Sequence, residues 1–264
     1  KVRNGSYFCF YNSAIANDIN ARVEMNNALR TGIGRKDLSL KYQPQVDLDT
    51  GTIIGVEALI RWQREAGKFV APNEFIPVAE SSGLIAPISE WVLHLSLSIF
   101  QNDDFVDLIR KTLQMTRCPA RLLELEVTES VIMENPAQTL RNFRELRDLG
   151  VSFAIDDFGT GYSSLSYLRQ LPVSALKIDK TFIDGLTENA DDAAIARTVI
   201  SLGRSLGMKV LAEGVETTDQ VEFLWSAKCH QAQGFLFSRP AAADEILPFI
   251  RNPGFTTFTQ KSLF

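Results

Sequence analysis

Short apolar runs alternate with amphipathic stretches along most of the chain. The runs with the length and composition of β-strands are residues 38–48, 53–62, 93–98, 122–129, 151–158, 175–180, 209–215 and 229–238. Apolar residues at helical spacing occupy residues 18–32, 73–82, 103–116, 136–149, 161–170, 193–207 and 217–227. This alternation predicts βαβ units around a mostly parallel sheet.

Eight strand-like runs in 264 residues favour a closed (β/α)8 barrel. A doubly wound open sheet is the alternative, but it normally carries a glycine-rich phosphate loop after its first strand, and none follows Leu48. One unit departs from the barrel pattern, because the helical segment around residues 88–93 runs into the strand at 93–98 with no loop residues between them. Either this unit is shortened or a stretch is absent from the chain.

Charged and polar residues recur at the ends of the predicted strands. The acids among them are Glu57, Glu126, Asp156, Asp157 and Glu213, and two further runs end near Lys177 and Gln233. In a barrel the carboxyl ends of the strands meet at one mouth, where carboxylates from several strands can hold divalent ions. For any one strand, incidental acids on a solvated edge are the alternative.

Two segments show why these acids suit a metal site. In the strand around Glu126, period-two alternation places Leu125 on the opposite face, so the glutamate is expected to look into the barrel. Asp156 and Asp157 are consecutive, and both reach one site only if the strand ends there, as the following glycine-rich stretch suggests. A simple Asp-capped turn is the alternative for that pair.

The other polar residues near strand ends have two interpretations each. Lys177 and Asp179 share a face, and a lysine beside metal ions could hold or deprotonate a water, because neighbouring cations depress its pKa. Glu57 and Arg61 share a face as a structural ion pair, or as a metal ligand and a phosphate contact. Glu216 is a ligand or, more simply, an acid at a helix N-terminus.

The composition is that of an ordinary soluble globular domain, with 45% hydrophobic residues, 22% charged residues and a net charge of −5. This charge argues against binding duplex nucleic acid but not against a small phosphate-bearing ligand. There is no apolar run of the length that crosses a membrane. Three cysteines without metal-type spacing indicate a reducing, cytoplasmic setting, with membrane tethering possible only through other domains.

The motifs together resemble the EAL-domain cyclic di-GMP phosphodiesterases. The tripeptide Glu57-Ala58-Leu59 lies between YQPQ and IRW, and the resemblance continues through LLELEVTES, AIDDFGTGYSSLSYLRQLPVSALKIDK, AEGVET and QGFLFSRP. It covers the chain in order from about Leu38 to Ile250. So many ordered motifs are far more specific than a single tripeptide.

The resemblance implies a modified (β/α)8 TIM-type barrel with one antiparallel strand, which hydrolyses cyclic di-GMP to linear 5'-pGpG. It implies two Mg²⁺ or Mn²⁺ ions in each active site, inhibition by Ca²⁺, and a homodimer. The implied ligands are Glu57, Glu126 and Asp156 for the first ion, and Asp156, Asp157 and, directly or through water, Glu213 for the second.

Further roles follow from the same resemblance. Lys177 corresponds to the lysine that contacts the attacking water, and with Glu57 and Glu213 forms the expected catalytic set. Glu129 corresponds to the acid that anchors the DDFGTGYSS loop. The residues expected near the dinucleotide are Gln43, Leu59, Arg61, Asp179, Glu216, Gln233 and Pro240.

The chain departs from the family pattern at His94, where the family usually has an asparagine that binds metal. Histidine is a competent ligand, so His94 is expected at the metal site, either altering the metal preference or weakening the first ion's binding. A catalytically weak or inactive cyclic di-GMP receptor is therefore the alternative function, and an interaction module without nucleotide binding is a third. The histidine at 230 is expected to be structural.

The resemblance also suggests how the chain is divided. Residues 1–17 resemble the tail of a preceding GGDEF-like domain, and 18–36 are expected to form a linker helix. Residues 37–251 are expected to form the EAL barrel, and 252–264 a C-terminal tail.

Overall fold

The computed structural model describes residues 13–35, 37–64, 69–84, 88, 105–159 and 168–251. The predicted strand at 93–98 with His94, most of the predicted helix at 161–170 and the predicted tail at 252–264 lie outside these residues. No helix among the described residues is both long enough and apolar enough to cross a bilayer.

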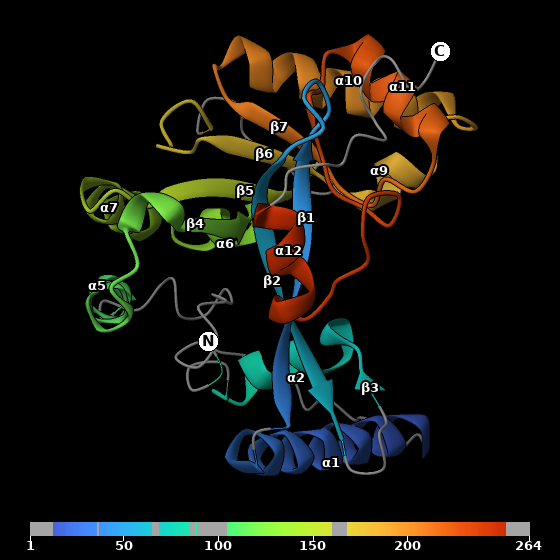
Figure 1. The fold of residues 1–264 in the computed structure, drawn as a ribbon. Helices are drawn as coiled ribbons and strands as arrows, with labels where there is room; N and C mark the ends of the chain where they lie inside the picture. The colour runs from blue at the N-terminus through green and yellow to red at the C-terminus, as the bar shows by residue number, and fades with distance from the viewer. Residues whose placement is uncertain are drawn as a thin grey trace, which may run out of the picture.

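The described strands form one curved mixed sheet (Figure 1) in the order β3-β2-β1-β8-β7-β6-β5-β4. Their bounds are β1 Leu38–Asp47, β2 Ile53–Gln63, β3 Phe69–Val70, β4 Glu124–Thr128, β5 Ser152–Phe158, β6 Ala175–Ile178, β7 Lys209–Ala212 and β8 Gln231–Ala232. Strands β4 to β8 are parallel. The mixed α/β sheet agrees with the barrel-type class predicted from the sequence.

The predicted antiparallel strand is β1, which runs antiparallel to both β2 and β8. A tight turn causes this reversal: Asp47 Oδ1 accepts hydrogen bonds from the N–H groups of Asp49 and Thr50, and Gly51 takes a φ of 66°. A turn this short can join only antiparallel neighbours. The two-residue β3, also antiparallel to its partner β2, was not predicted.

The described helices lie around the sheet (Figure 1). They are α1 Ser13–Arg35, α2 Pro72–Ser81, α5 Phe105–Thr116, α6 Glu129–Glu134, α7 Pro136–Asp148, α9 Lys180–Asp184, α10 Ala190–Ser205, α11 Thr218–Ala227 and α12 Ala243–Arg251. Most predicted helices agree with these bounds, although α1 extends beyond 18–32 at both ends. The sequence analysis missed α6, α9 and α12, and the first two are too short to show a helical period.

The predicted strand at 229–238 is wrong beyond its first residues, because only Gln231–Ala232 pair as β8. At Gly234 the chain turns and passes close to the loop after β7, so that a Cβ there would lie 2.0 Å from the carbonyl oxygen of Val215. The Leu236 N–H donates to the same carbonyl. The apolar run therefore folds into a turn that packs on a neighbouring loop.

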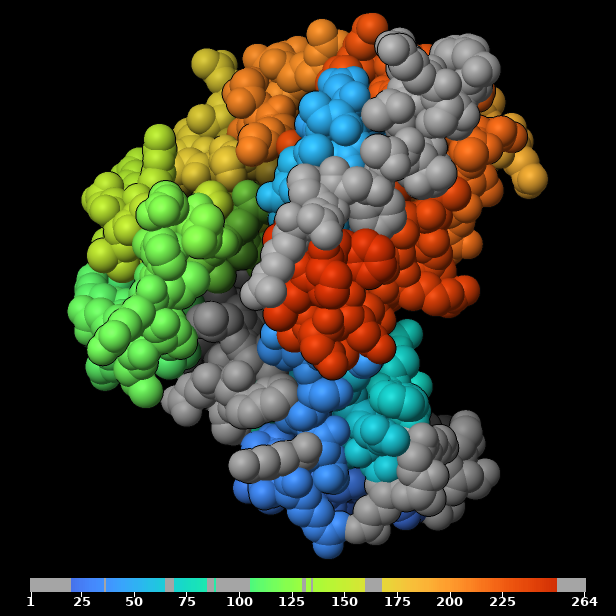
Figure 2. Space-filling model, viewed as in Figure 1, coloured from blue at the N-terminus to red at the C-terminus, as the bar shows by residue number. Residues whose placement is uncertain are grey.

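The hydrophobic core lies between the sheet and its helices. Phe143 of α7 stacks on Phe153 of β5, with ring centroids 4.1 Å apart, and both are fully buried. On the surface, Figure 2 shows α12 in red against the blue β1 strand. Helix α1 lies across the far end of the β1–β2 hairpin beside α2 (Figure 1), where Gly32 approaches Trp62. The sheet that carries the acids is therefore packed against its helices.

Candidate active site

Four carboxylates, from β2, β4, β5 and the residue that follows β7, surround the ammonium group of Lys177. The Nζ atom lies 2.5 Å from Glu213 Oε1, 2.8 Å from Glu126 Oε2, 3.3 Å from Asp156 Oδ1 and 3.7 Å from Glu57 Oε1. The lysine side chain is only 2% exposed. Residues far apart in the sequence thus converge on one point, and a buried lysine occupies its centre.

Strand geometry positions these groups. Lys177 lies in the middle of β6, whose four residues are all buried, between β5 and β7. In β4 the apolar Leu125 and Val127 are 2% and 4% exposed, while Glu126 faces the other side of the sheet toward Lys177. The period-two interpretation of this strand is confirmed.

Asp156 and Asp157 reach the same site because β5 is irregular there. The β5–β6 register shifts between Ile155 and Phe158, and Asp157 has a φ of 52°. This left-handed conformation, which aspartate tolerates better than most residues, reverses the usual alternation. One carboxylate oxygen each from Asp156, Asp157 and Glu213 lie within 4.8 Å of one another, as a divalent ion requires.

In the site without metal ions, the neighbouring carboxylates determine the pKa of Lys177. Burial by itself would lower this pKa, but Glu126, Glu213, Glu57 and Asp156 outweigh burial and raise it well above its ordinary value. The reason is that its neighbours are carboxylates, so the lysine stays charged. In the metal-free site it is therefore a cation.

One ammonium does not neutralise the whole cluster. Burial, and then the negative charges of Glu57 and Asp156, raise the pKa of Glu126 to about 8, although Lys177 opposes the shift. Burial likewise raises the pKa of Glu213 to about 7. For Asp157, burial followed by the charge of Asp156 raises the pKa to about 6. The excess negative charge and the all-oxygen donors suit hard divalent cations such as Mg²⁺ or Mn²⁺.

The carboxylate of Glu57 is bonded to the buried Gln233, which is in turn bonded to the buried Gln43. Gln233 Nε2 donates to Glu57 Oε2 and, at 3.1 Å, to Gln43 Oε1. Gln43 Nε2 in turn donates to the carbonyl oxygen of Ser238 at 3.0 Å.

The guanidinium of Arg61, which shares a strand face with Glu57, donates to the carbonyl oxygen of Ile60 at 2.8 Å. The ion-pair partner of Glu57 is instead Lys177.

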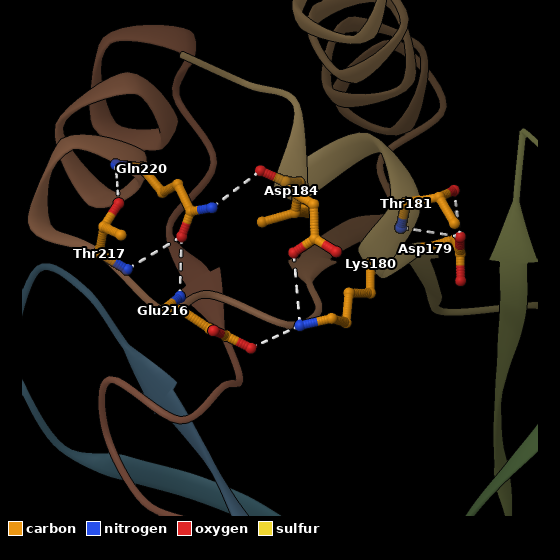
Figure 3. Close-up of polar contacts among 8 residues, drawn as sticks. Asp179, Lys180, Thr181, Asp184, Glu216, Thr217 and Gln220 are labelled. Atoms are coloured by element: carbon orange, nitrogen blue, oxygen red, sulfur yellow. Dashed lines mark hydrogen bonds and ion pairs between the residues drawn. The ribbon is translucent and has the colours of Figure 1, made fainter. Parts of the chain in front are cut away.

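A second cluster of polar side chains joins α9, which follows β6, to the segment that follows β7 (Figure 3). Glu216 pairs with Lys180, which also lies 3.3 Å from Asp184. Gln220 Oε1 accepts from the N–H groups of Glu216 and Thr217, at 2.7 and 2.9 Å, and its Nε2 donates to the carbonyl oxygen of Ile183. The side chain of Glu216 therefore pairs with α9, while its backbone N–H is bonded to Gln220 in the first turn of α11. The sequence analysis missed Lys180 and Gln220, although the glutamine at the third position of a helix is a recognisable capping-box signal.

The remaining predicted residues are placed as follows. Asp179 caps α9 by accepting from the Thr181 N–H at 3.0 Å. Leu59 of β2 and Pro240 are partly buried. Glu129 begins α6 and is 8% exposed, and its carboxylate oxygens have no hydrogen-bond partner within the described part of the chain. The histidine at 230 pairs with Asp49 of the β1–β2 turn at 2.8 Å, which supports its structural interpretation.

A cavity of about 540 Å³ lies at the opposite ends of β5 and β6. Arg147 and Arg169 line it, together with Ser152, Ser174 and Ser205. These three hydroxyls already donate to protein oxygens, and the C-termini of α7 and α10 lie beside the arginines. The cavity is therefore less suited to ligand chemistry than the acid cluster.

Fold and site together define a barrel-type α/β domain with a cluster of acidic side chains that could hold a divalent cation. Residues 26–240 match the EAL domain family, and the chain belongs to this family. The fold, the motifs and the clustered acids thus lead to one assignment.

Two relatives from Pseudomonas aeruginosa carry functional names. The bifunctional diguanylate cyclase/cyclic di-GMP phosphodiesterase MucR is 40% identical over 267 residues, covering 93% of this chain and 39% of that protein. The cyclic di-GMP phosphodiesterase NbdA is 39% identical over 251 residues, covering 87% of this chain and 32% of that protein. The chain thus spans well under half the length of these relatives.

Solved structures agree with the fold. The PaMucR phosphodiesterase in complex with c-di-GMP has a TM-score of 0.81 and 41% identity, covering 84% of this chain and 99% of that one. The EAL enzyme Bd1971 in its cGMP-bound form has a TM-score of 0.85 and 29% identity, covering 89% and 71%.

Proposed function

We propose that the chain is a phosphodiesterase domain that hydrolyses cyclic di-GMP to linear 5'-pGpG with two Mg²⁺ or Mn²⁺ ions. The observation that carries the proposal is the convergence of Glu57, Glu126, Asp156 and Glu213 on Lys177. The relatives named as cyclic di-GMP phosphodiesterases support the substrate. We further propose a homodimer, as the resemblance implies, and a cytoplasmic setting, as the cysteine pattern indicates.

The carboxylates divide between two ions. Glu57, Glu126 and Asp156 would hold the first, and His94 stays a proposed ligand beside them. Asp156, Asp157 and Glu213, whose oxygens lie within 4.8 Å of one another, would hold the second. When bound, a pair of divalent ions lowers the pKa of water and stabilises negative charge on phosphate oxygens.

The protein groups supply position and charge. Lys177 lies among the carboxylates that would hold the ions, and its side chain is proposed to donate to the attacking water and hold it in line with phosphorus. Arg61 is the proposed phosphate contact, because its planar fork matches two phosphate oxygens. The proposed contacts with the rest of the dinucleotide are Gln43, Leu59, Asp179, Glu216, Gln233 and Pro240.

A turnover assay with a matched pair of variants tests the proposal. The purified chain is incubated with cyclic di-GMP and Mn²⁺, and the products are separated by chromatography. We expect pGpG from the parent chain, and a loss of at least about 100-fold in Glu126→Gln, which removes a ligand. The control is Glu124→Gln on the same strand, because Glu124 is exposed and contacts Ser174 instead.

Three outcomes would contradict the proposal. Tight binding of cyclic di-GMP without turnover would indicate the receptor function, and no binding at any metal concentration would indicate an interaction module. Equal turnover by Glu126→Gln and the parent chain would overturn the ligand assignment.

A further inference from the structure

We infer that Gln233 and Gln43 form a buried amide relay whose task is to orient the carboxylate of Glu57 toward the metal site. This inference rests on the proposed function, since it concerns the metal that the acid cluster would hold. It gives both glutamines a positioning role in the metal site itself, in the absence of any nucleotide.

The relay has fixed ends. In the β1–β2 pair, Gln43 lies directly opposite Glu57. The Gln233 backbone is held on both sides, because its N–H donates to the Ala212 carbonyl oxygen at 2.8 Å and its own carbonyl accepts from the Val215 N–H at 3.0 Å. The side chains of Gln43 and Gln233 therefore start from rigid backbone and are only 7% and 4% exposed.

Hydrogen-bond chemistry allows each amide only one orientation. An ionised Glu57 only accepts, so the NH₂ group of Gln233 must face it. The second N–H of that group then donates to Gln43 Oε1 at 3.1 Å, which turns the NH₂ group of Gln43 toward the Ser238 carbonyl oxygen at 3.0 Å. A carboxylate at one end and a backbone carbonyl at the other thus fix the whole chain of bonds.

The relay also determines which oxygen of Glu57 is free. Its Oε2 atom accepts from Gln233, while Oε1 faces the cluster, 3.7 Å from Lys177 Nζ. A hydrogen bond to one oxygen restricts the rotation of the carboxylate, so the other oxygen is presented to a metal ion at a smaller entropic cost. Gln233 Oε1 is buried without a hydrogen-bond partner in the described part of the chain, which leaves one acceptor available at the site.

Metal binding without nucleotide separates this role from a substrate contact. The variants are Gln233→Met, Gln43→Met and the double variant, with Mn²⁺ affinity measured by calorimetry and no cyclic di-GMP present. We expect Gln233→Met to weaken Mn²⁺ binding by about 10- to 100-fold and Gln43→Met by about 10-fold. The double variant should match Gln233→Met, because both changes break one chain of bonds.

The control is Gln45→Met. Gln45 lies on the same strand, opposite Gly55, and should keep the parental Mn²⁺ affinity within about twofold. If both relay variants bind Mn²⁺ as the parent does and change only the KM for cyclic di-GMP, the relay is overturned. If the parent binds Mn²⁺ but makes no pGpG, the proposed function fails while the relay is still tested.

A second measurement covers variants that do not fold. In the parent chain, the side-chain amide NMR signals of Gln233 and Gln43 should both shift when Mg²⁺ is added without nucleotide. Unchanged signals under saturating Mg²⁺ would refute the relay, because a metal ion on Glu57 must alter the bonds that the relay shares with it.

Discussion

Replacing Lys177 by methionine tests the electrostatic balance of the site. The Lys177 Nζ atom lies 2.5 to 3.7 Å from oxygens of the four carboxylates. At an effective dielectric constant of about 20, each of these contacts corresponds to roughly 4 to 7 kcal/mol before the cost of burying the charges is subtracted. Removing one member of a buried ion-pair network usually costs about 3–5 kcal/mol, because the remaining charges are left uncompensated. We therefore expect the free energy of unfolding of Lys177→Met to be about 3–5 kcal/mol lower than that of the parent chain, in a chelating buffer at pH 8.

The matched control is Lys180→Met. Lys180 also faces two carboxylates, Glu216 and Asp184, but its side chain is 47% exposed. Solvent screens such pairs, so the control should lose less than about 1 kcal/mol. Urea titration of both variants gives the comparison, and added Mn²⁺ should narrow the deficit of Lys177→Met, because divalent ions compensate the same acids. Equal losses in the two variants would refute the reasoning.

Three further predictions concern pH, backbone conformation and packing. In the folded protein without metal, Glu126 and Glu213 have pKa values raised to about 8 and 7. In the unfolded chain both carboxyl groups lose their protons at their ordinary, lower pKa, so above that pH the folded state binds more protons than the unfolded state. Calorimetry in the presence of a chelator should therefore show the free energy of unfolding falling by a few kcal/mol between pH 5 and 8.5, on the order of 1.4 kcal/mol per pKa unit. A constant free energy of unfolding over this range would contradict the raised pKa values. Asp157→Asn keeps a side chain that tolerates the φ of 52° and removes a charge, so thermal unfolding should show unchanged or higher metal-free stability and weaker stabilisation by Mn²⁺. A metal-free loss above about 1 kcal/mol would count against this view. Gly234→Ala should lower the free energy of unfolding by at least about 1–3 kcal/mol in urea titration, because its Cβ would meet the Val215 backbone. The control is Gly34→Ala in α1, which should be neutral or stabilising because a Cβ there has nothing within 4 Å. Equal effects of the two substitutions would contradict the packing argument.

Local pattern was enough to predict much of the fold. Alternation in β4 placed Glu126 opposite Leu125, and helical spacing identified α2, α5, α7, α10 and α11 within a few residues. These predictions succeed because they depend on which face of one element is apolar. They fail where the element is very short, as in α9, or where an apolar run packs on a loop, as after Gly234.

The sequence by itself determined the order of strands and helices, the family, and the presence of acids at strand ends. Only the tertiary structure decided that a buried lysine stands at the centre of those acids, and that the acids raise its pKa in the site without metal ions. The bulge at Asp157 and the bonds from Gln233 to Gln43 and Glu57 were likewise beyond prediction. The physical reason is that such contacts depend on sheet order and register, which bring residues about 190 positions apart within hydrogen-bonding distance.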